Sequence, residues 1–236
     1  MSNTIGRVHS FQSLGAVDGP GLRYVIFMQG CPYMCPYCHN PDTHHFSGGI
    51  EYSVEEIVSR VKRYTDYFGE DGGVTVSGGE PLMQQEFLTE LFKRLKEEGI
   101  GTAVDTAGIK PNERTEELLR YTDIVLCDIK FPDCERYLKY VGISLDDVLS
   151  FLSLCEKSGK RIYLRHVIVP GMTGSAESVK EVIDLAKSVC TPEKIELLPF
   201  KKLCLEKYKR LGIPFPLADT PECSPKLIKE LYKACL

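Results

Sequence analysis

Residues 30–40 have the sequence Gly-Cys-Pro-Tyr-Met-Cys-Pro-Tyr-Cys-His-Asn, so Cys31, Cys35 and Cys38 follow the spacing C-x3-C-x2-C. Thiolates this close together on one loop can surround a single metal centre, because soft sulfur ligands select iron–sulfur clusters, zinc or copper(I). A zinc site usually uses a second pair of Cys or His ligands, and the sequence has no such pair. A 4Fe–4S cluster with three cysteine ligands keeps one iron open, as reactive metal centres do. The loop therefore predicts a reactive cluster, and a chance group of buried thiols is the alternative.

The remaining cysteines are scattered along the chain and form no second cluster motif. They are Cys127, Cys134, Cys155, Cys190, Cys204, Cys223 and Cys235. Most of them stand among apolar or helical residues, where a free cysteine behaves as a small buried hydrophobe. The chain is also too long for a small domain stapled by disulfides. We therefore expect one cluster only.

Composition and charge exclude several classes of function. The chain has 236 residues, 43% hydrophobic and 26% charged, which is enough for one large core in a single domain over 1–236. A net charge of −4 without a Lys/Arg-rich stripe argues against nucleic acid as a partner. No apolar run approaches the roughly 20 residues that span a bilayer, and the N-terminus lacks the apolar core of a signal peptide. We expect a cytoplasmic protein that does not bind a membrane.

Outward from the cysteine loop, apolar runs typical of strands alternate with helical patterns. The expected strands are residues 22–29, 73–77, 102–105, 123–129, 161–169 and 194–198. The expected helices are residues 54–68, 84–98, 113–120, 135–141, 145–158, 176–189, 205–210 and 226–234. Ser53 and Glu56 stand where a capping box would begin the first helix. We expect residues 1–21 to be a loop-rich N-terminal segment and residues 201–236 to form C-terminal helical segments.

This alternation predicts an α/β fold in which helical crossovers join the strands of a parallel sheet. Six units are too few for the eight of a closed barrel. The pattern by itself is compatible with a doubly wound open sheet and with a partial barrel.

Chemically active residue types gather at the carboxyl ends of the expected strands, where parallel α/β folds place functional sites. In chain order they are the cysteine loop, Gly78-Gly79-Glu80, Asp105-Thr106, Asp128 and Lys130, Arg165 and His166, and Phe200-Lys201. Any one of them could be an ordinary loop residue, but their shared position favours one site. In Gly78-Gly79-Glu80 the glycines permit a close backbone approach, and the carboxylate can accept hydrogen bonds from an ammonium group. By itself this motif is weak and is more typical of a turn.

The cysteine loop resembles that of the radical S-adenosylmethionine enzymes, in which C-x3-C-x2-C holds a 4Fe–4S cluster. In that family the open iron binds the amino and carboxylate groups of S-adenosylmethionine. An electron from the cluster splits the sulfonium and releases a 5′-deoxyadenosyl radical, which abstracts a hydrogen atom. The resemblance implies a partial, open (β/α)6 barrel with outer helices, and Cys31, Cys35 and Cys38 as the cluster ligands.

The same resemblance implies roles for residues on the rim. Gly78-Gly79-Glu80 resembles the motif that contacts the amino group of S-adenosylmethionine. Tyr37 and His39 stand at positions that contact the adenine side. The segment Asp128-Ile129-Lys130 resembles a stretch at the methionine carboxylate and ribose, and Arg165 is assigned to the same cofactor site.

Three further assignments follow from the resemblance. Asp105 and Thr106, together with Asp128, resemble residues that help to hold a monovalent cation. Asp18 is placed near a substrate peptide, and a role as a turn cap is the alternative. Lys201 stands where the family often has a histidine after L-P-Y, so its role is open. A cation here could still reach a carboxylate or ribose oxygen of the cofactor.

More extended segments resemble the activating enzymes of glycyl radical enzymes, and they run nearly from end to end. They are Arg7–Phe11, Val17–Arg23, Tyr37–Pro41, Arg165–Gly171 and Lys194–Phe200. Only 39 residues without a cysteine separate Cys38 from Gly78, whereas related activators often insert extra clusters after the first motif. This short spacer favours pyruvate formate-lyase as the target. The resemblance also implies flavodoxin or ferredoxin as the electron donor, and we expect a monomer.

Two other functions remain compatible with the sequence. One keeps the radical chemistry but acts on another glycyl radical enzyme or on a small molecule. The other is an electron-transfer or iron-sensing protein with a passive cluster. The second is disfavoured because only three cysteines are available and polar residues gather around the open iron.

Overall fold

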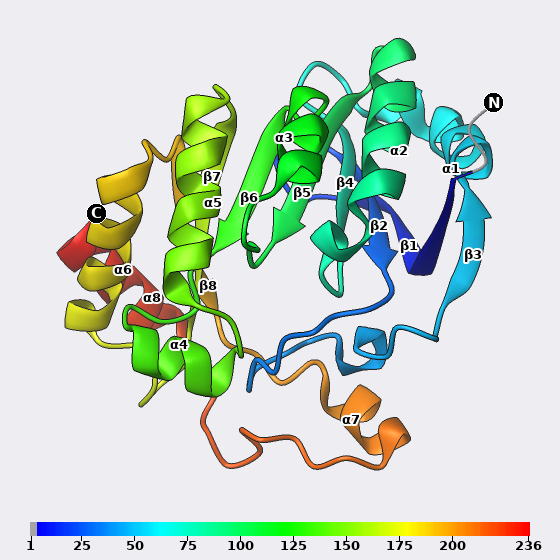
Figure 1. Cartoon of the computed structure of the whole chain (residues 1–236). Coiled ribbons are helices and arrows are strands. Elements are labelled where there is room, and N and C mark those ends of the chain that lie inside the picture. Colours follow the sequence, from blue (N-terminus) through cyan, green and yellow to red (C-terminus); the bar gives the residue numbers. More distant parts are fainter. Residues whose placement is uncertain (1–3) are drawn as a thin grey trace.

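Six parallel strands make up most of one sheet and run to one of its edges (Figure 1). In the computed structural model, which describes residues 4–236, they are β2 (Arg23–Met28), β4 (Gly73–Gly78), β5 (Gly101–Thr106), β6 (Ile124–Asp128), β7 (Arg161–Ile168) and β8 (Lys194–Pro199). They lie side by side in that order, each parallel to the next. Within the described residues, no pairing joins the two edges of the sheet. The predicted open arrangement of six parallel strands is confirmed.

Two antiparallel strands extend this sheet beyond β2. They are β1 (Ile5–Gly15), which pairs with β2, and β3 (Ile50–Ser53), which pairs with β1. The prediction of a loop-rich segment over 1–21 is therefore wrong for residues 5–15, and residues 1–3 lie outside the described part of the chain. Irregular register between Val8 and Ser10, and between Gln12 and Gly15, interrupts the alternation of side chains that marks a strand in a sequence.

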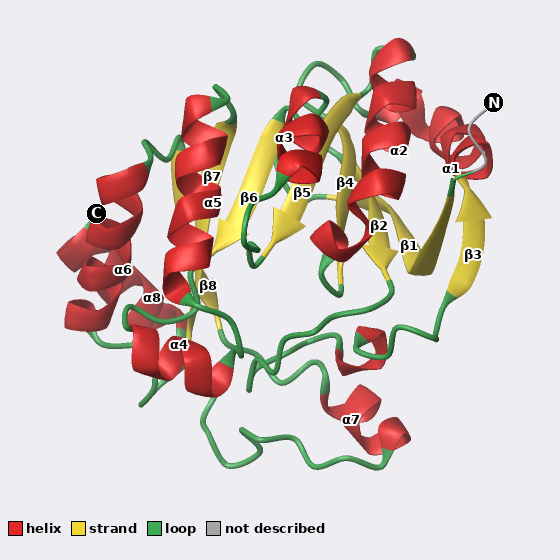
Figure 2. Cartoon of the chain, viewed as in Figure 1, coloured by secondary structure: helices red, strands yellow, loops and turns green. Residues whose placement is uncertain are grey.

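The helices largely follow the predicted bounds. They are α1 (Val54–Val61), α2 (Gln85–Glu97), α3 (Glu113–Arg120), α4 (Cys134–Tyr140), α5 (Leu145–Lys157), α6 (Ala176–Val189), α7 (Leu205–Leu211) and α8 (Pro225–Cys235). The capping box of Ser53 and Glu56 is present at the start of α1. The helix predicted over 54–68 is an α-helix only to Val61 and continues as a 3-10 helix over Lys62–Tyr67. Helices α2, α3 and α5 cover one face of the sheet (Figure 2).

The two faces of the sheet are packed differently. Because side chains alternate along a strand, Ile26, Val76 and Val104 point into the main core formed with the helices. The opposite, inner face carries a small separate apolar cluster of Ala103, Ile124, Leu126 and Tyr163. Within residues 4–236, no helix combines the length and apolar composition that crossing a membrane requires.

This alternation decides which side chains face the inside of the open barrel at its carboxyl end. Two residues after members of the inner cluster, and therefore on the same face, come Asp105 on β5, Asp128 on β6 and Arg165 on β7. Beyond the small apolar cluster, the inner face of β5, β6 and β7 is thus charged at the carboxyl ends of the strands.

Candidate active site

A cavity of about 260 Å³ opens at the carboxyl ends of the parallel strands. Its lining includes Cys31, Cys35, Tyr37, Cys38, His39, Gly78, Gly79, Glu80, Asp105, Thr106, Asp128, Lys130 and Arg165. These residues come from the loops after β2, β4 and β6 and from the ends of β5, β6 and β7. The fold therefore brings most of the candidate residues into one site.

The cysteine loop follows β2 and is pinned at its start and in its middle. Gly30, whose φ of +98° favours glycine, donates from its N–H to the carbonyl of Thr43 at 2.7 Å. The hydroxyl of Tyr33 donates to the carbonyl of Gly108 at 2.5 Å, which ties the loop to the segment after β5. None of the ten cysteines, all within residues 4–236, forms a disulfide. The loop thus presents free thiols on a fixed backbone.

The three thiols of this loop fit a cubane cluster. Burial raises the pKa of Cys31, of Cys35 and of Cys38, the last to about 12, so a bound metal must displace their protons. Across residues 4–236, no three Cys, His, Asp or Glu side chains converge on the position of one metal ion. In a cubane, however, each thiolate binds a different iron, so separated thiols on one cavity wall suit a 4Fe–4S cluster. The backbone N–H of Asn40 also donates to Cys38 Sγ at 3.3 Å, a bond typical of cluster cysteines.

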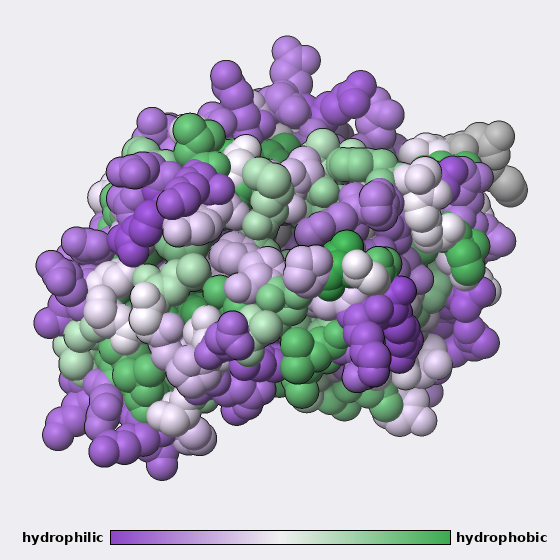
Figure 3. Space-filling model, turned by 90° about the horizontal axis from the view of Figure 1, so that it is seen from below, coloured by the Kyte–Doolittle hydropathy of each residue, from purple (hydrophilic) through white to green (hydrophobic). Residues whose placement is uncertain are grey.

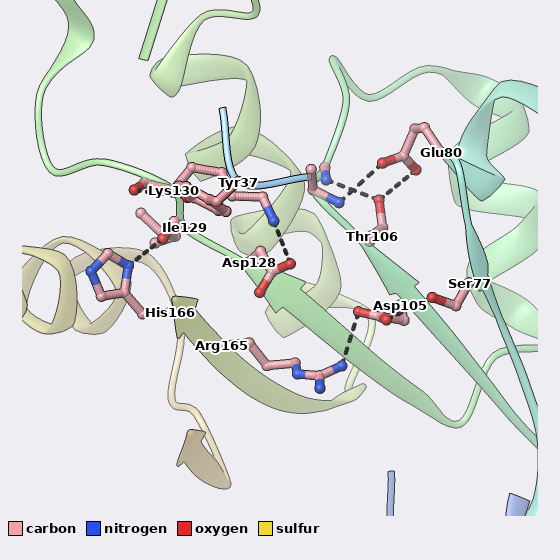
Figure 4. Close-up of polar contacts among 12 residues, drawn as sticks. Tyr37, Ser77, Glu80, Asp105, Thr106, Asp128, Ile129, Lys130, Arg165 and His166 are labelled. Carbon is pink, nitrogen blue, oxygen red and sulfur yellow. Dashed lines mark hydrogen bonds and ion pairs between the residues drawn. The ribbon is translucent and has the colours of Figure 1, made fainter. Parts of the chain in front are cut away.

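Glu80 is fully buried, and its carboxylate is held by three donors. Oε1 accepts from the Thr106 hydroxyl at 2.6 Å (Figure 4). Oε1 also accepts from the Leu82 N–H at 3.0 Å. Oε2 accepts from the Ala107 N–H at 3.0 Å. Burial raises the pKa of Glu80 to about 7, although these hydrogen bonds lower it. The carboxylate is therefore rigidly placed between β4 and β5 and titrates near neutral pH.

Asp105 belongs to a polar network on the inner face. Its Oδ2 accepts from the Ser77 hydroxyl at 2.8 Å, and its Oδ1 lies 3.2 Å from Arg165 Nη1 (Figure 4). Thr106 is the next residue on β5, so its side chain points to the other face, where its hydroxyl bonds Glu80. Asp105 and Thr106 therefore do not present their side chains to the same point.

Asp128 is the carboxylate with an unused acceptor. Its Oδ2 lies 2.5 Å from Lys130 Nζ, whereas no donor among residues 4–236 reaches its buried Oδ1. Lys130 Nζ is 5.8 Å from the centre of the Tyr37 ring. Burial lowers the pKa of Lys130, but Asp128 and neighbouring groups outweigh this and raise it, so the ammonium stays charged. A buried oxygen without a donor is costly, and this one lines a cavity where a ligand can supply the missing hydrogen bond.

Comparison with known proteins identifies the family. Residues 25–186 match the family described as the radical SAM superfamily. The chain is 43% identical over 230 residues to the pyruvate formate-lyase-activating enzyme of Clostridium pasteurianum, a match that covers 97% of this chain and 96% of that protein. The chain belongs to the family of pyruvate formate-lyase-activating enzymes. It is also 39% identical over 236 residues to the pyruvate formate-lyase-activating enzyme of Staphylococcus epidermidis, covering 97% and 94% of the two chains.

Solved radical SAM structures share the fold. A domain of a pyruvate-formate lyase-activating enzyme from Bacteroides vulgatus aligns with a TM-score of 0.57 at 24% identity, covering 70% of this chain and 92% of that one. A radical SAM methyltransferase from Sphaerobacter thermophilus aligns with a TM-score of 0.65 at 17% identity, covering 90% and 63%. At these identities the likeness concerns the fold alone.

Two residues that the family resemblance assigned to the cofactor have their side chains elsewhere. Ile129 is fully buried, and its carbonyl accepts from His166 Nδ1 at 2.6 Å. Burial lowers the pKa of His166, which keeps this imidazole neutral. Lys201 Nζ lies 3.2 Å from Glu222, whereas the Lys201 carbonyl bonds His39 Nε2 at 2.8 Å. In this member of the family, the backbone carbonyl of Lys201 therefore orients His39, the residue expected on the adenine side of the cofactor.

Asp18 lies on a segment that Thr75 and Arg165 hold against the inner face of the sheet. The Thr75 hydroxyl donates to the Asp18 carbonyl at 2.6 Å, and Arg165 Nη2 donates to the neighbouring carbonyl of Val17 at 3.4 Å. Burial and the negative charge of Asp105 raise the pKa of Asp18, whereas Arg165 lowers it. Asp18 is thus held beside the charged network rather than on a free turn.

Several lining residues carried no chemical signal in the sequence. They include Tyr33, Asn40, Thr43, Ser77, Ala107, Val167, Leu198 and Pro199. Strand alternation identifies some of them, since Val167 shares the face of Arg165 two residues before it. Asn40 could not be found in this way, because its place depends on contacts with distant segments.

Proposed function

We propose that the protein activates pyruvate formate-lyase, and that one 4Fe–4S cluster and S-adenosylmethionine are its cofactors. When bound, the cluster supplies the electron that cleaves S-adenosylmethionine, and the resulting 5′-deoxyadenosyl radical takes a hydrogen atom from a backbone glycine of the partner. The observation that carries this proposal is a C-x3-C-x2-C loop lining the same cavity as Asp128, Lys130 and Glu80, in a chain 43% identical to such an activator.

The roles of the cavity residues follow from their chemistry. Cys31, Cys35 and Cys38 hold the cluster from the loop after β2. Lys130 attracts the methionine carboxylate, and the open oxygen of Asp128 accepts from the ribose. These two assignments rest on a partly buried cation and an unused buried acceptor, both of which belong to residues that line the cavity.

The adenine and amino ends of S-adenosylmethionine require different surroundings. Tyr37 and His39 offer ring faces on the adenine side, and Gly78 and Gly79 allow backbone carbonyls to approach the amino group. Glu80 adds a negative charge behind them, although three protein donors already occupy its carboxylate. Ile129 contributes through its backbone, because its side chain belongs to the core.

A monovalent cation beside the methionine carboxylate is part of the proposal. The open Oδ1 of Asp128 is the strongest candidate ligand. Asp105 can join it only by loosening its bonds to Ser77 or Arg165. Thr106 would have to contribute its carbonyl, since its hydroxyl bonds Glu80.

The partners are proteins. Exposed apolar side chains occur on the cysteine loop, on α4 and just before α7: Met34 is 65% exposed, Leu138 64% and Leu203 82%. Figure 3 shows the molecule from below, the side on which the cysteine loop, α4 and α7 lie, with hydrophobic patches between hydrophilic residues. A surface of this kind suits a protein partner. We propose that a loop of pyruvate formate-lyase reaches the cavity past Asp18, that flavodoxin or ferredoxin supplies the electron, and that the protein acts as a cytoplasmic monomer.

Anaerobic reconstitution followed by product analysis tests this function. With a strong reductant and S-adenosylmethionine, the protein should release 5′-deoxyadenosine and methionine. With pyruvate formate-lyase added, electron paramagnetic resonance should detect a glycyl radical on the partner. If 5′-deoxyadenosine and methionine form but the radical appears only on a different glycyl radical enzyme, that enzyme is the target. An intact cluster that yields no 5′-deoxyadenosine would instead identify a passive electron-transfer protein.

A further inference from the structure

Helix α7 lies against the exit of the cysteine loop, although the two segments are far apart in the sequence (Figure 1). The Tyr208 hydroxyl donates to the carbonyl of Cys38 at 3.3 Å. Lys207 Nζ donates to Asn40 Oδ1 at 2.9 Å and to Asp42 Oδ1 at 3.1 Å. Two adjacent residues of α7 thus hold three residues directly at and after the last cluster cysteine.

Asn40 connects these contacts to the site. Its backbone N–H donates to Cys38 Sγ at 3.3 Å, and its side-chain Nδ2 donates to the carbonyl of Gly78 at 3.4 Å. Lys207 bonds the Asn40 Oδ1, and the Gly78 carbonyl bonds its Nδ2. The Asn40 amide therefore cannot flip without losing both of these side-chain contacts. Lys207 therefore fixes the rotamer of a residue that touches both a cluster cysteine and the Gly-Gly-Glu segment.

The same helix is itself anchored to the end of β8. The rings of Tyr208 and Phe215 lie 4.8 Å apart, and Phe215 stacks on Phe200 at 6.2 Å. Phe200 is fully buried, directly after β8. On the other side, His9 Nε2 lies 3.2 Å from the second carboxylate oxygen of Asp42. Helix α7 is thus anchored to the hydrophobic core where it contacts the loop.

We propose that α7 acts as a clamp on the cluster-binding loop, in which Lys207 is a positioning residue and Tyr208 a second support. The clamp keeps the Asn40 N–H on Cys38 Sγ and places the Lys207 charge on Asn40 and Asp42, just after the last cluster cysteine. Hydrogen bonds to cysteine sulfur and nearby positive charge favour the reduced cluster. The consequence for the cluster rests on the proposed function, whereas the clamping of residues 38–42 does not.

Hydrogen exchange of the cluster-free protein tests the clamp by itself. Lys207→Met removes the ammonium and keeps an unbranched side chain, and Lys209→Met changes an exposed lysine of the same helix. We expect amide exchange over residues 38–43 to accelerate in Lys207→Met and to stay at the wild-type rate in Lys209→Met. Equal exchange in all three proteins would overturn the proposal. If Lys207→Met fails to fold, Tyr208→Phe carries the same test, because it removes only the hydroxyl that bonds Cys38.

Two measurements on the reconstituted protein separate positioning from general stabilisation. The midpoint potential of the cluster should become more negative in Lys207→Met, and the Kd for S-adenosylmethionine should rise about two- to twelve-fold, the scale of one net hydrogen bond. Lys207→Arg should restore both values, since a guanidinium can also reach Asn40 and Asp42. An unchanged potential and Kd in a folded Lys207→Met protein would contradict the proposal. Failure of the wild type to assemble a cluster would refute the proposed function and leave the exchange result standing.

Discussion

The segments after β4 and at the end of β6 each present a carboxylate to the same cavity, but the two carboxylates are satisfied differently. Glu80 accepts three hydrogen bonds from the protein itself. Asp128 has one oxygen on Lys130 and one buried oxygen that no described residue reaches. An unpaired buried acceptor costs about 1–3 kcal/mol. The difference therefore separates a carboxylate that organises the site from one that is held ready for a ligand.

The largest expected effect comes from removing a ligand of the iron–sulfur cluster. Cys35→Ala should abolish stable cluster assembly, because one iron loses its thiolate, whereas the wild type should hold about four irons per chain. Cys134→Ala, which changes an exposed cysteine of α4, is the control and should retain the wild-type iron content. If Cys35→Ala keeps a full cluster and cleaves S-adenosylmethionine, the cysteine loop does not bind the cluster.

Asp128→Asn should affect ligand binding more than folding. The substitution removes the charge but leaves an oxygen for Lys130, so the loss falls mainly on the ligand. We expect affinity for S-adenosylmethionine to fall by about 1.5–3 kcal/mol, the scale of a hydrogen bond to a charged group. Anaerobic titration measures the affinity, and chemical denaturation of the cluster-free protein measures the stability. If Asp128→Asn loses more free energy of unfolding than free energy of S-adenosylmethionine binding, Asp128 is a structural carboxylate, as we expect Glu80 to be.

Glu80→Gln, in contrast, should affect folding more than ligand binding. Its amide nitrogen cannot accept a hydrogen bond, so at least one of the three donors, such as the Ala107 N–H, loses its partner. The expected cost is about 1–3 kcal/mol of the free energy of unfolding. Denaturation curves of wild type and variant, both without cluster, give this value. Wild-type stability combined with a large loss of S-adenosylmethionine affinity would make Glu80 a direct ligand instead.

The stability contributed by Glu80 should also depend on pH. Because burial raises its pKa in the folded state from 4.5 to about 7, the folded protein binds this proton more tightly than the unfolded chain. The contribution is fully present below the unfolded value and is lost as the pH rises to about 7. The free energy of unfolding of the wild type relative to Glu80→Gln should therefore fall across this range. A difference that does not change with pH would mean that Glu80 is already ionised at the lower limit.

Asp18 offers a third carboxylate and the smallest expected effect on the cofactors. Asp18→Ala should leave iron content and affinity for S-adenosylmethionine at wild-type values, because Asp18 is not among the residues that line the cavity. Glycyl radical formation should slow if this carboxylate meets the partner's loop. Spin quantitation with limiting partner and saturating S-adenosylmethionine gives the rate, and a wild-type rate would leave Asp18 a structural residue.

Local patterns in the sequence predicted the framework well. The apolar runs that became β2, β4 and β6 and the capping box of Ser53 and Glu56 depend on neighbouring residues, and all appear as expected. The strand β1 was missed because its register shifts break the alternation and polar residues occupy both of its faces. A strand of this kind is specified by its two partners, β2 and β3, more than by its own composition.

The sequence by itself determined the chemistry that this protein offers: a three-cysteine loop, carboxylates and a lysine at the ends of parallel strands, and the face on which each side chain lies. These features depend on spacing along the chain and on strand alternation, both of which a sequence displays directly. The tertiary structure alone decided which groups are already satisfied. Thr106 and Ala107 occupy Glu80, Glu222 takes the Lys201 ammonium, and Lys207 reaches Asn40 across 167 residues. Such partners meet only when distant segments pack, because a hydrogen bond requires a donor within about 3 Å and no local pattern encodes that approach.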